Sequence, residues 1–412
     1  MFKTRRARRI FKALAVIAIS GVLGIGTLLG SLWLEHRNEV KLPTPTGPFP
    51  VGRVISVWAD DAHSDTLAPA PRTKRELLVW IWYPSAAGHS VVMDDYLPAQ
   101  LRPKAEVLGG KNIWTLLTRD VSNVRGHSAR DPDVSPQQRS YPVVIMRAGA
   151  SASVLNYSTL AEDLASHGYI VVGFDAPYRT GLVVFPDGRV MRRTEQNNPE
   201  SCVVPDRAQM ERCLSRVMTA WTGDIAFVLS GLARLNAPDS SGKFSGRLDM
   251  TRVGVFGHSL GGAVAAQFCH EDSRCKAGID IDGAPHGSVI QAGLSQPFMF
   301  LLSDHGEASD PESIQIVSDI KSIYDHVPSD RRLHATIRGA FHFTFSDDGA
   351  LLKSGIVRGV LRMLGKLGID ARRQLAVTTY CVHSFFDAHL KGTGSSRPSI
   401  SSPLYPKIEI LE

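Results

Sequence analysis

The feature that most constrains the fold is an alternation of strand-length apolar runs with amphipathic helical segments. The apolar runs cover residues 51–58, 77–83, 141–146, 169–174, 252–256, 277–281, 297–302 and 333–337. Helical periodicity follows at 156–167 and 206–235, and again after Asp370, which can cap a last helix. Strands that helices cover on both faces need nearly continuous apolar sequence. The pattern therefore predicts an α/β fold with a mostly parallel central sheet and helices on both faces.

The N-terminal 34 residues have the features of a membrane anchor. Six of the 46 Lys and Arg residues precede position 13, and the remaining 40 balance the 40 Asp and Glu residues, so nothing in the body of the chain suggests nucleic-acid binding. Residues 13–34 carry no charge and span about 33 Å as a helix, enough for a bilayer core of about 30 Å. They exceed the usual apolar region of a cleaved signal peptide and end without a good cleavage site.

These observations predict four segments. Residues 1–12 form a basic cytoplasmic arm, 13–34 an uncleaved transmembrane signal anchor, 35–50 a Pro-rich linker, and 51–412 the catalytic domain. By the positive-inside rule, residues 35–412 are exported to the periplasm or the extracellular space. A cleaved leader is the alternative.

Export is compatible with the cysteine pattern. Cys202 and Cys213 flank the start of a predicted helix, and Cys269 and Cys275 lie within one helix-to-strand turn, so both pairs are spaced to close disulfides. Cys381 is expected to be a small buried apolar side chain.

Residues 178–205 interrupt the alternation of strands and helices with a predicted hairpin turn at 185–189. This excursion is either an active-site lid or a surface loop.

The motif that carries chemistry is Gly257-His258-Ser259-Leu260-Gly261, between the apolar run 252–256 and a small-residue helix at 263–269. A G-x-S-x-G sequence in strand–turn–helix context forms a sharp elbow that exposes the serine above the sheet. Glycines at 257 and 261 allow the helix and the strand to approach closely. Ser259 is therefore the candidate nucleophile, although a glycine-rich turn with a capping serine would give the same pattern.

A serine nucleophile needs a base and an acid that orients it, in the chain order serine, acid, histidine. His342 is the best-placed base, because it follows the run 333–337 at the carboxyl edge of the predicted sheet. Asp282 and Asp304 both lie at strand ends, and strand position alone does not choose between them. The tight exit after Asp282 favours it, since an orienting carboxylate should sit on a rigid element.

An oxyanion hole requires two backbone N–H groups directed at the developing charge. One donor is expected from Leu260, directly after the nucleophile. The second is expected from the loop 147–153, at Ala150, where small residues allow the backbone to approach a tetrahedral intermediate.

At these residues the chain resembles the platelet-activating-factor acetylhydrolases of the plasma, lipoprotein-associated phospholipase type and their bacterial relatives. Besides the elbow, the resemblance rests on 47–52 (GPFPVG), 75–84 (RELLVWIWYP), 163–171 (DLASHGYIV), 278–282 (GIDID) and 336–342 (TIRGAFH), and it extends from about residue 47 to the C-terminus. It implies that Asp282 is the acid and His342 the base. The chain departs from the family's His-Gly-x-Gly oxyanion loop, with Ala148-Gly149-Ala150-Ser151 in its place.

The resemblance implies an α/β-hydrolase that removes short or oxidised sn-2 acyl groups from phospholipids, as a 1-alkyl-2-acetylglycerophosphocholine esterase does, without calcium or any other cofactor. No cysteine or histidine cluster has zinc-site spacing, so no metal is expected. The expected partners are the ester substrate and the membrane, which residues 13–34 are expected to enter. No nucleic-acid partner is expected. A general carboxylesterase or polyester hydrolase of the dienelactone hydrolase or cutinase kind is the alternative enzyme. A catalytically silent binding module is the alternative of a different class.

Overall fold

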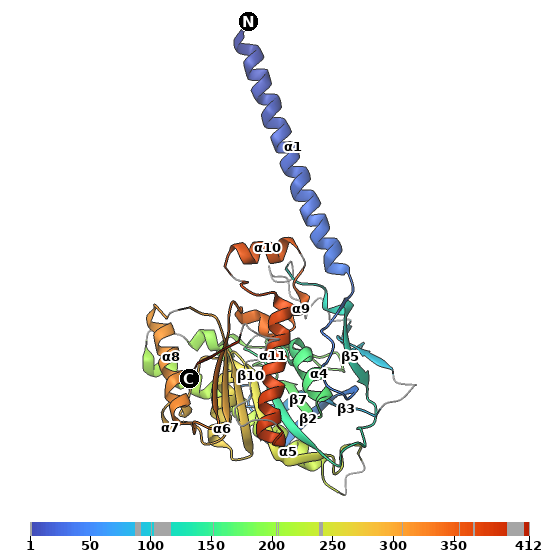
Figure 1. The fold of residues 1–412 in the computed structure, drawn as a ribbon, viewed down its shortest axis with the longest axis vertical. Coiled ribbons are helices and arrows are strands. Elements are labelled where there is room, and N and C mark those ends of the chain that lie inside the picture. The colour runs from blue at the N-terminus through green and yellow to red at the C-terminus, as the bar shows by residue number, and fades with distance from the viewer. Residues whose placement is uncertain are drawn as a thin grey trace.

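The structure is a computed structural model of the 412-residue chain. It describes residues 2–86, 92–99, 101–102, 117–150, 152–202, 204, 206–238, 242–306, 308–353, 355–365, 367–393 and 408–411. The catalytic part is a layered α/β domain, from which one long N-terminal helix projects (Figure 1).

The core of the domain is one 12-stranded sheet in the order β1-β5-β2-β3-β7-β6-β10-β11-β12-β13-β14, with β4 paired to β5. The strands are β1 (Val40–Lys41), β2 (Val51–Ser64), β3 (Lys74–Pro84), β4 (Met93–Asp95), β5 (Val124–Arg130), β6 (Tyr141–Arg147), β7 (Ile170–Asp175), β10 (Leu248–His258), β11 (Cys275–Ile281), β12 (Phe298–Ser303), β13 (Arg332–Ile337) and β14 (Ile408–Leu411). From β7 through β6, β10, β11 and β12 to β13, every neighbouring pair is parallel. Antiparallel pairs occur toward the edges, where β3 pairs with β2 and β7, β4 with β5, and β14 with β13. The predicted mostly parallel sheet is confirmed, and all eight predicted strands are present.

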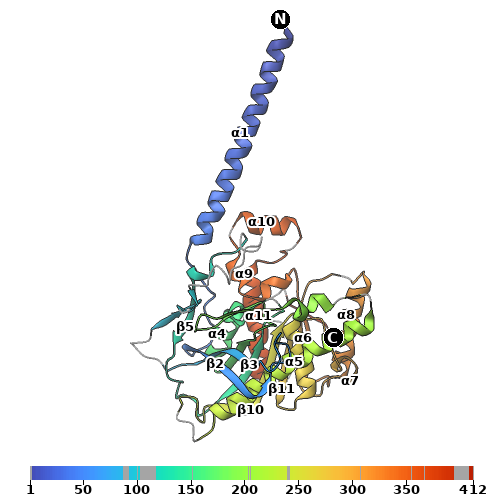
Figure 2. The same cartoon turned by 180° about the vertical axis from the view of Figure 1, so that it is seen from behind.

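Helices cover both faces of this sheet (Figure 2). The helices of the domain are α4 (Ser158–Ser166), α5 (Arg207–Leu235), α6 (Leu260–Glu271), α7 (Val289–Ala292), α8 (Pro311–His326), α9 (Asp348–Leu351), α10 (Ile356–Met363) and α11 (Ala371–Phe386), with short turns η2 (Val121–Asn123), η3 (Val154–Tyr157), η4 (Glu195–Asn197), η5 (Pro199–Cys202) and η6 (His342–Phe345) and a π-helical end η7 (Asp387–Lys391). Side chains of β6 alternate between two cores: Val144 and Met146 pack with α4 and α11, while Val143 and Ile145 pack with α5 and α6. Burial on both faces explains why the central strands are continuously apolar.

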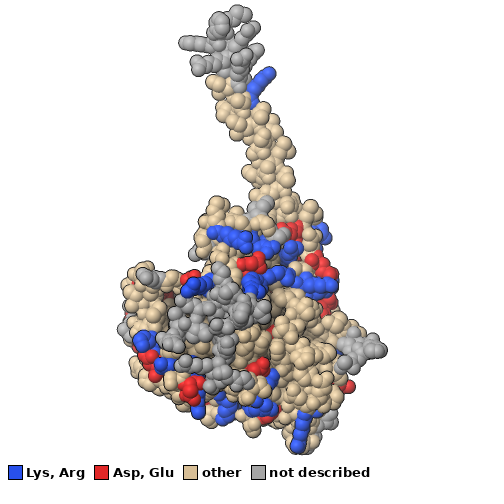
Figure 3. Space-filling view, in the orientation of Figure 1, with Lys and Arg blue, Asp and Glu red and all other residues tan. Residues whose placement is uncertain are grey.

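The N-terminal helix α1 (Phe2–Arg37) stands away from the domain (Figures 1 and 2). Residues Ile10–Arg37 are long and apolar enough to cross a membrane, and the most apolar window within them has none of its residues buried. Figure 3 shows that the stretch of α1 between its first turns and the domain is almost free of Lys, Arg, Asp and Glu, whereas Lys and Arg gather on the domain around its base. The last turns of α1 contact the domain through buried Leu32 and through an ion pair of 2.8 Å between Glu35 and Arg119. The stretch expected as a linker thus begins with the end of α1 and includes β1.

The excursion at 178–205 forms a separate antiparallel hairpin of β8 (Leu182–Val184) and β9 (Val190–Arg192), with the predicted turn between them. Its far end is tied to α5 by a disulfide between Cys202 and Cys213. Both expected disulfides are present, and Cys381 is free and buried as expected.

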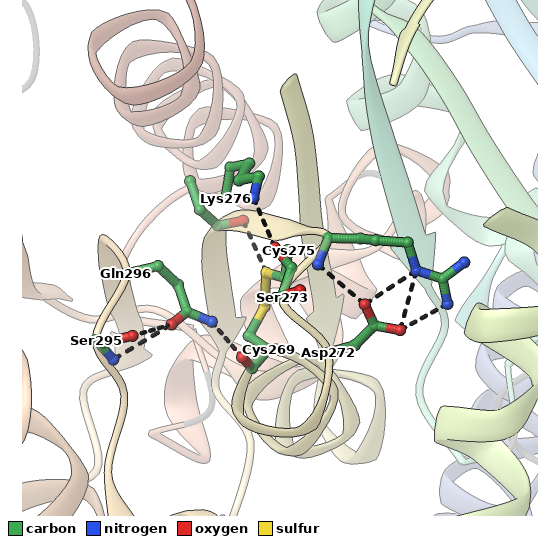
Figure 4. Close-up of a disulfide and its surroundings, with 9 residues drawn as sticks. Cys269, Asp272, Ser273, Cys275, Lys276, Ser295 and Gln296 are labelled. Atoms are coloured by element: carbon green, nitrogen blue, oxygen red, sulfur yellow. Dashed lines mark hydrogen bonds and ion pairs between the residues drawn. A yellow bond between two sulfur atoms is a disulfide. The ribbon is translucent and has the colours of Figure 1, made fainter. Parts of the chain in front are cut away.

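The second disulfide lies close to the elements that carry the candidate site. It joins Cys269, near the end of α6, to Cys275, at the start of β11, and Figure 4 shows it beside the turn that connects the two elements. The side-chain amide of Gln296 donates to the backbone carbonyl of Cys269, which ties this turn to the segment before β12. Because α6 starts after Ser259 and β11 ends before Asp282, the disulfide joins the far ends of two elements whose near ends lie at the site.

Candidate active site

Ser259 sits at a strained elbow between β10 and α6. Its φ of 56° and ψ of −128° are unusual for a residue with a side chain, and strain of this kind is concentrated at functional sites. The turn is tight enough to need glycine on both sides of the serine. A Cβ at Gly257 would lie 2.2 Å from the Gly261 carbonyl carbon, and one at Gly261 would lie 2.5 Å from the Ala148 oxygen. The predicted close approach of the helix and the strand is confirmed.

Asp282 and His342 meet beside this elbow. Asp282 directly follows β11 and His342 begins η6, and the His342 Nδ1 lies 2.7 Å from the Asp282 Oδ2. The Asp282 side chain is fully buried, and its backbone φ is 54°. Burial alone would raise the pKa of Asp282, but hydrogen bonds from His305 and His342 outweigh it and hold that pKa well below its usual range. Asp282 is therefore an anion that accepts the Nδ1 proton of His342 and leaves the other ring nitrogen free for chemistry.

His342 also lies against the elbow itself. Its ring centroid is 4.5 Å from that of His258, the residue directly before Ser259. Segments that are far apart in the sequence therefore converge, with Ser259 at the end of β10, Asp282 at the end of β11 and His342 after β13.

Asp304, the competing candidate acid, lies elsewhere. Its side chain is exposed, and its Oδ2 accepts a hydrogen bond of 3.0 Å from the backbone N–H of Gly339. It therefore fastens the loop that leads to His342, whereas the imidazole itself contacts Asp282.

The two candidate oxyanion donors flank the nucleophile. Leu260 is the first residue of α6, where backbone N–H groups have no partner within the helix. Within the described part of the chain, neither the Leu260 N–H nor the Ala150 N–H has a hydrogen-bond acceptor. A Cβ at Gly149 would lie only 3.4 Å from the Ser259 Cβ, so the loop before Ala150 passes directly beside the serine. Both N–H groups are therefore candidate donors to a developing negative charge.

Two contacts hold this loop, and the sequence analysis missed both. The Gly149 N–H donates to the Tyr157 hydroxyl at 3.3 Å, and that hydroxyl is hydrogen-bonded to the His258 Nδ1 at 2.7 Å. Burial lowers the pKa of His258 to about 3, so its ring is neutral. From the excursion, Arg193 donates to the Ala150 carbonyl at 2.9 Å. No local sequence pattern marks such contacts, because their partners come from distant segments.

A further residue of the site also escaped prediction. His305 follows β12, and its Nε2 lies 2.8 Å from the Asp282 Oδ1. It is one of several histidines after the elbow, and its position after a strand was the only available signal.

Among the described residues, one group could offer three ligand atoms to a metal: Asp163, His167 and His383. Its contacts are those of a hydrogen-bonded cluster. The His167 and His383 rings stack 4.0 Å apart at 22°, and both N–H and O–H of Thr46 donate to the Asp163 Oδ1. Nearly parallel stacked rings do not direct their in-plane lone pairs at one point, so this geometry does not suit a metal ion.

Comparison with known proteins identifies the family. The family model described as platelet-activating factor acetylhydrolase, isoform II, matches residues 34–179 and 225–394, which is well over half of the chain. The chain belongs to this family. Among curated relatives, a probable 1-alkyl-2-acetylglycerophosphocholine esterase of Arthroderma benhamiae is 26% identical over 416 residues, covering 96% of this chain and 100% of that protein.

Mammalian members of the platelet-activating factor acetylhydrolase family match over a shorter span. The enzymes of Cavia porcellus and Canis lupus familiaris are 25% and 27% identical, over 57% and 61% of this chain. The chain matches only 55% and 57% of their respective lengths.

A solved structure supports the same enzyme class. The ferulic acid esterase of Streptomyces cinnamoneus superposes with a TM-score of 0.71 at 26% identity, covering 90% of this chain and 99% of that one. The expected family, the α/β-hydrolase fold and the class of carboxylic ester hydrolase are confirmed.

Proposed function

We propose that this esterase hydrolyses short or oxidised sn-2 acyl esters of phospholipids through an acyl-enzyme on Ser259. The observation that carries the proposal is the buried Asp282–His342 pair, with 2.7 Å between Oδ2 and Nδ1, next to a serine held at a strained elbow. This is the arrangement in which a histidine can activate a serine hydroxyl and an aspartate can fix the imidazole tautomer.

The reaction proceeds in two half-steps. The Ser259 Oγ bonds to the acyl carbon while its proton passes to the His342 Nε2, and the N–H groups of Leu260 and Ala150 bind the resulting oxyanion. Collapse of the intermediate breaks the bond between the acyl carbon and the glycerol oxygen, and this oxygen takes the proton from His342. Water then attacks the acyl-enzyme with the same proton transfers, which releases the acid and restores Ser259.

The substrate class is inferred from the relatives. The Arthroderma benhamiae protein is named a probable 1-alkyl-2-acetylglycerophosphocholine esterase, and the mammalian ones are named platelet-activating factor acetylhydrolases. A membrane-tethered esterase would also meet lipid substrates at the bilayer surface.

An organophosphonate probe tests the nucleophile. We expect it to label Ser259, and we expect Ser259→Ala to lower kcat by about 10⁴-fold or more while the protein keeps its unfolding temperature. A folded and active wild-type protein that is labelled on another serine would refute the assignment. A folded wild-type protein with neither labelling nor turnover would favour the binding module.

The similarity to the ferulic acid esterase favours a second candidate, because the superposition covers 90% of this chain. This candidate is an aryl or general carboxylesterase with the same Ser259 chemistry. The two are separated by kcat/KM values for 2-acetyl, oxidised-chain and long-chain phospholipids and for methyl ferulate. The kcat/KM value for short-chain phospholipids should exceed the values for long-chain phospholipids and for methyl ferulate by about 100-fold or more. The reverse order of these values would support the aryl esterase.

The proposed topology follows from charge and hydropathy. We propose that residues 1–12 stay in the cytoplasm, that 13–34 anchor the chain, and that the catalytic domain of residues 51–412 lies outside. The apolar stretch Ile10–Arg37 within α1 and the basic residues before it support this topology.

A further inference from the structure

One buried carboxylate at the proposed site is shared by two imidazoles. The Asp282 Oδ2 faces the His342 Nδ1 at 2.7 Å, and its Oδ1 faces the His305 Nε2 at 2.8 Å. Ser303 contributes both its N–H and its hydroxyl to the same carboxylate, each at 2.8 Å. The described structure thus places His305 in a contact that the triad reaction does not require.

We infer that His305 is a positioning residue of the esterase: it fixes Asp282 from the side opposite His342, and its charge controls the pH range in which His342 works as the base. The inference rests on the proposed function, in which His342 activates Ser259.

The hydrogen bonds define the protonation of the His305 ring. The Ser303 hydroxyl donates to the Asp282 Oδ2, so its oxygen can accept from the His305 Nε2, which lies 3.0 Å away. The His305 Nε2 therefore carries a proton, shared between the Ser303 oxygen and the Asp282 Oδ1. The side chain is 65% exposed, whereas that of Asp282 is fully buried. His305 can therefore take up a second proton on Nδ1 from solvent without breaking its contact with Asp282.

The charges around the two rings decide the direction of the effect. The charged groups that act on His305 are Asp282, from the end of β11, and Asp304, from its own turn. Beside His342, the charged group is Asp282, and the His258 ring of β10 is neutral. The hydrogen bond to Asp282 raises the pKa of His305 against the opposing effect of burial, which favours the cationic form of the ring.

A cationic His305 opposes a second positive charge on His342. It offsets part of the negative charge of Asp282, and it repels an imidazolium that shares the same carboxylate. Protonation of the base is therefore disfavoured, and we expect kcat/KM to hold to lower pH when His305 is present. Protonation of the two rings is coupled through Asp282. The measurable quantity is therefore the apparent pKa of the acid limb of the pH profile of kcat/KM, where activity falls toward low pH.

The experiment compares three variants of the full chain in detergent with a water-soluble p-nitrophenyl ester. His305→Gln keeps an N–H donor near the Nε2 position but cannot become cationic. His305→Phe removes both the donor and the charge. His63→Gln is the matched control, because His63 is an exposed surface histidine paired with Asp60 at 3.1 Å, on β2.

We expect His305→Gln to move the acid limb of kcat/KM upward by about one pH unit, because it removes the cation beside Asp282. His305→Phe should show the same shift and a kcat that is also roughly three- to tenfold lower, since Asp282 loses one of its donors. His63→Gln should change neither quantity. An active wild-type enzyme whose acid limb is the same in all three variants would overturn the inference.

A second readout needs no turnover. NMR titration of the wild-type protein with carbon-labelled histidine should show His305 becoming cationic at a pH above the ordinary imidazole value of about 6.5. A His305 ring that stays neutral down to pH 5 would refute the inference, even if neither His305 variant folds. Failure of the proposed function would differ, because wild-type enzyme would then lack both turnover and phosphonate labelling of Ser259.

Discussion

Two acids lie at neighbouring strand ends of this sheet, and their surroundings differ sharply. Asp282 is buried and accepts hydrogen bonds from Ser303, His305 and His342, which keep it ionised and immobile. Asp304 is exposed and caps the Gly339 N–H. An acid that orients imidazole must itself be held in place, so the physical requirements of the role are met at Asp282.

Substitution of each acid by asparagine separates their roles. Asp282→Asn should lower kcat by roughly 10²–10⁴-fold, because the amide no longer selects the His342 tautomer with its proton on Nδ1. Asp304→Asn should change kcat less than threefold, since an amide oxygen can still accept from Gly339. Steady-state kinetics and thermal unfolding of both variants provide the measurement. The opposite ranking in two folded proteins would assign the acid to Asp304.

Asp175 offers a pH-dependent prediction at the base of the oxyanion loop. Its carboxyl accepts from the Ser153 hydroxyl at 2.8 Å and from the Val154 N–H at 2.9 Å. Burial raises the pKa of Asp175 to about 6, above its value of about 3.9 in an unfolded chain. The folded state therefore binds this proton more tightly than the unfolded state does. The stability that this proton provides is complete below about pH 4 and is lost as pH rises through about 6.

The variant Asp175→Asn keeps an acceptor for Val154 but cannot ionise. Its unfolding free energy relative to wild type should therefore increase by about 1–2 kcal/mol between pH 4.5 and pH 8. Urea unfolding at these two pH values measures the difference. A stability difference that is independent of pH would show that Asp175 does not titrate in this range.

At the scale of elements, the start of helix α6 is packed without room for a side chain. A Cβ at Gly262 would lie 1.9 Å from the Asp280 Oδ1, and that oxygen is held by the Gly283 N–H at 2.8 Å. Asp280 is fully buried, so its carboxyl group has no solvent on its side into which it could shift. Burial also raises the pKa of Asp280 well above the usual value. The helix that begins at the nucleophile therefore rests directly on the strand that ends at the acid.

Gly262→Ala should lower the unfolding free energy by about 1–3 kcal/mol through overpacking, and it should lower kcat because Asp280 and Gly283 flank Asp282. Gly359→Ala is the matched control within helix α10, since among the described residues no atom outside that helix's own backbone lies within 4 Å of the added Cβ. With no described neighbour to displace, that substitution should leave kcat unchanged and stabilise the helix by about 0.5–1 kcal/mol. Chemical denaturation measures both variants, and equal effects would contradict the packing argument.

The elements could be predicted from the sequence because each follows from local periodicity and caps. Asp370 illustrates this, since its side chain accepts from the Arg372 and Arg373 N–H groups at the start of α11, as its position predicted. The elbow and the two disulfides followed from short spacings. The edge strands of the sheet and the residues around the candidate site could not be predicted in this way. Ser303 and His305 reach Asp282 only because β12 pairs with β11 in one register, and this register depends on the whole fold.

At the scale of the whole molecule, helix α1 combines a free apolar length with a fixed base. None of the residues in its most apolar window is buried, and its length and composition are those of a helix that can cross a membrane. Near the domain, Leu32 packs in a cluster with Leu352, Val357 and Leu361, and Glu35 pairs with Arg119 at 2.8 Å. Helix α1 is therefore fixed to the domain at its base, and in the proposed topology it should hold the domain at a defined distance from the bilayer.

This arrangement predicts an uncleaved anchor with its N-terminus in the cytoplasm. N-terminal sequencing of the membrane fraction should find residues before position 25, and the protein should resist alkaline extraction. A mature protein that starts between residues 25 and 45 would show cleavage instead.

The orientation of the helix should depend on the basic arm, since positive charges before an apolar segment keep that end of the chain in the cytoplasm. Replacing Arg5, Arg6, Arg8 and Arg9 by Asn should lower the fraction of catalytic domain accessible to external protease, and replacing exposed Arg331 by Asn should not.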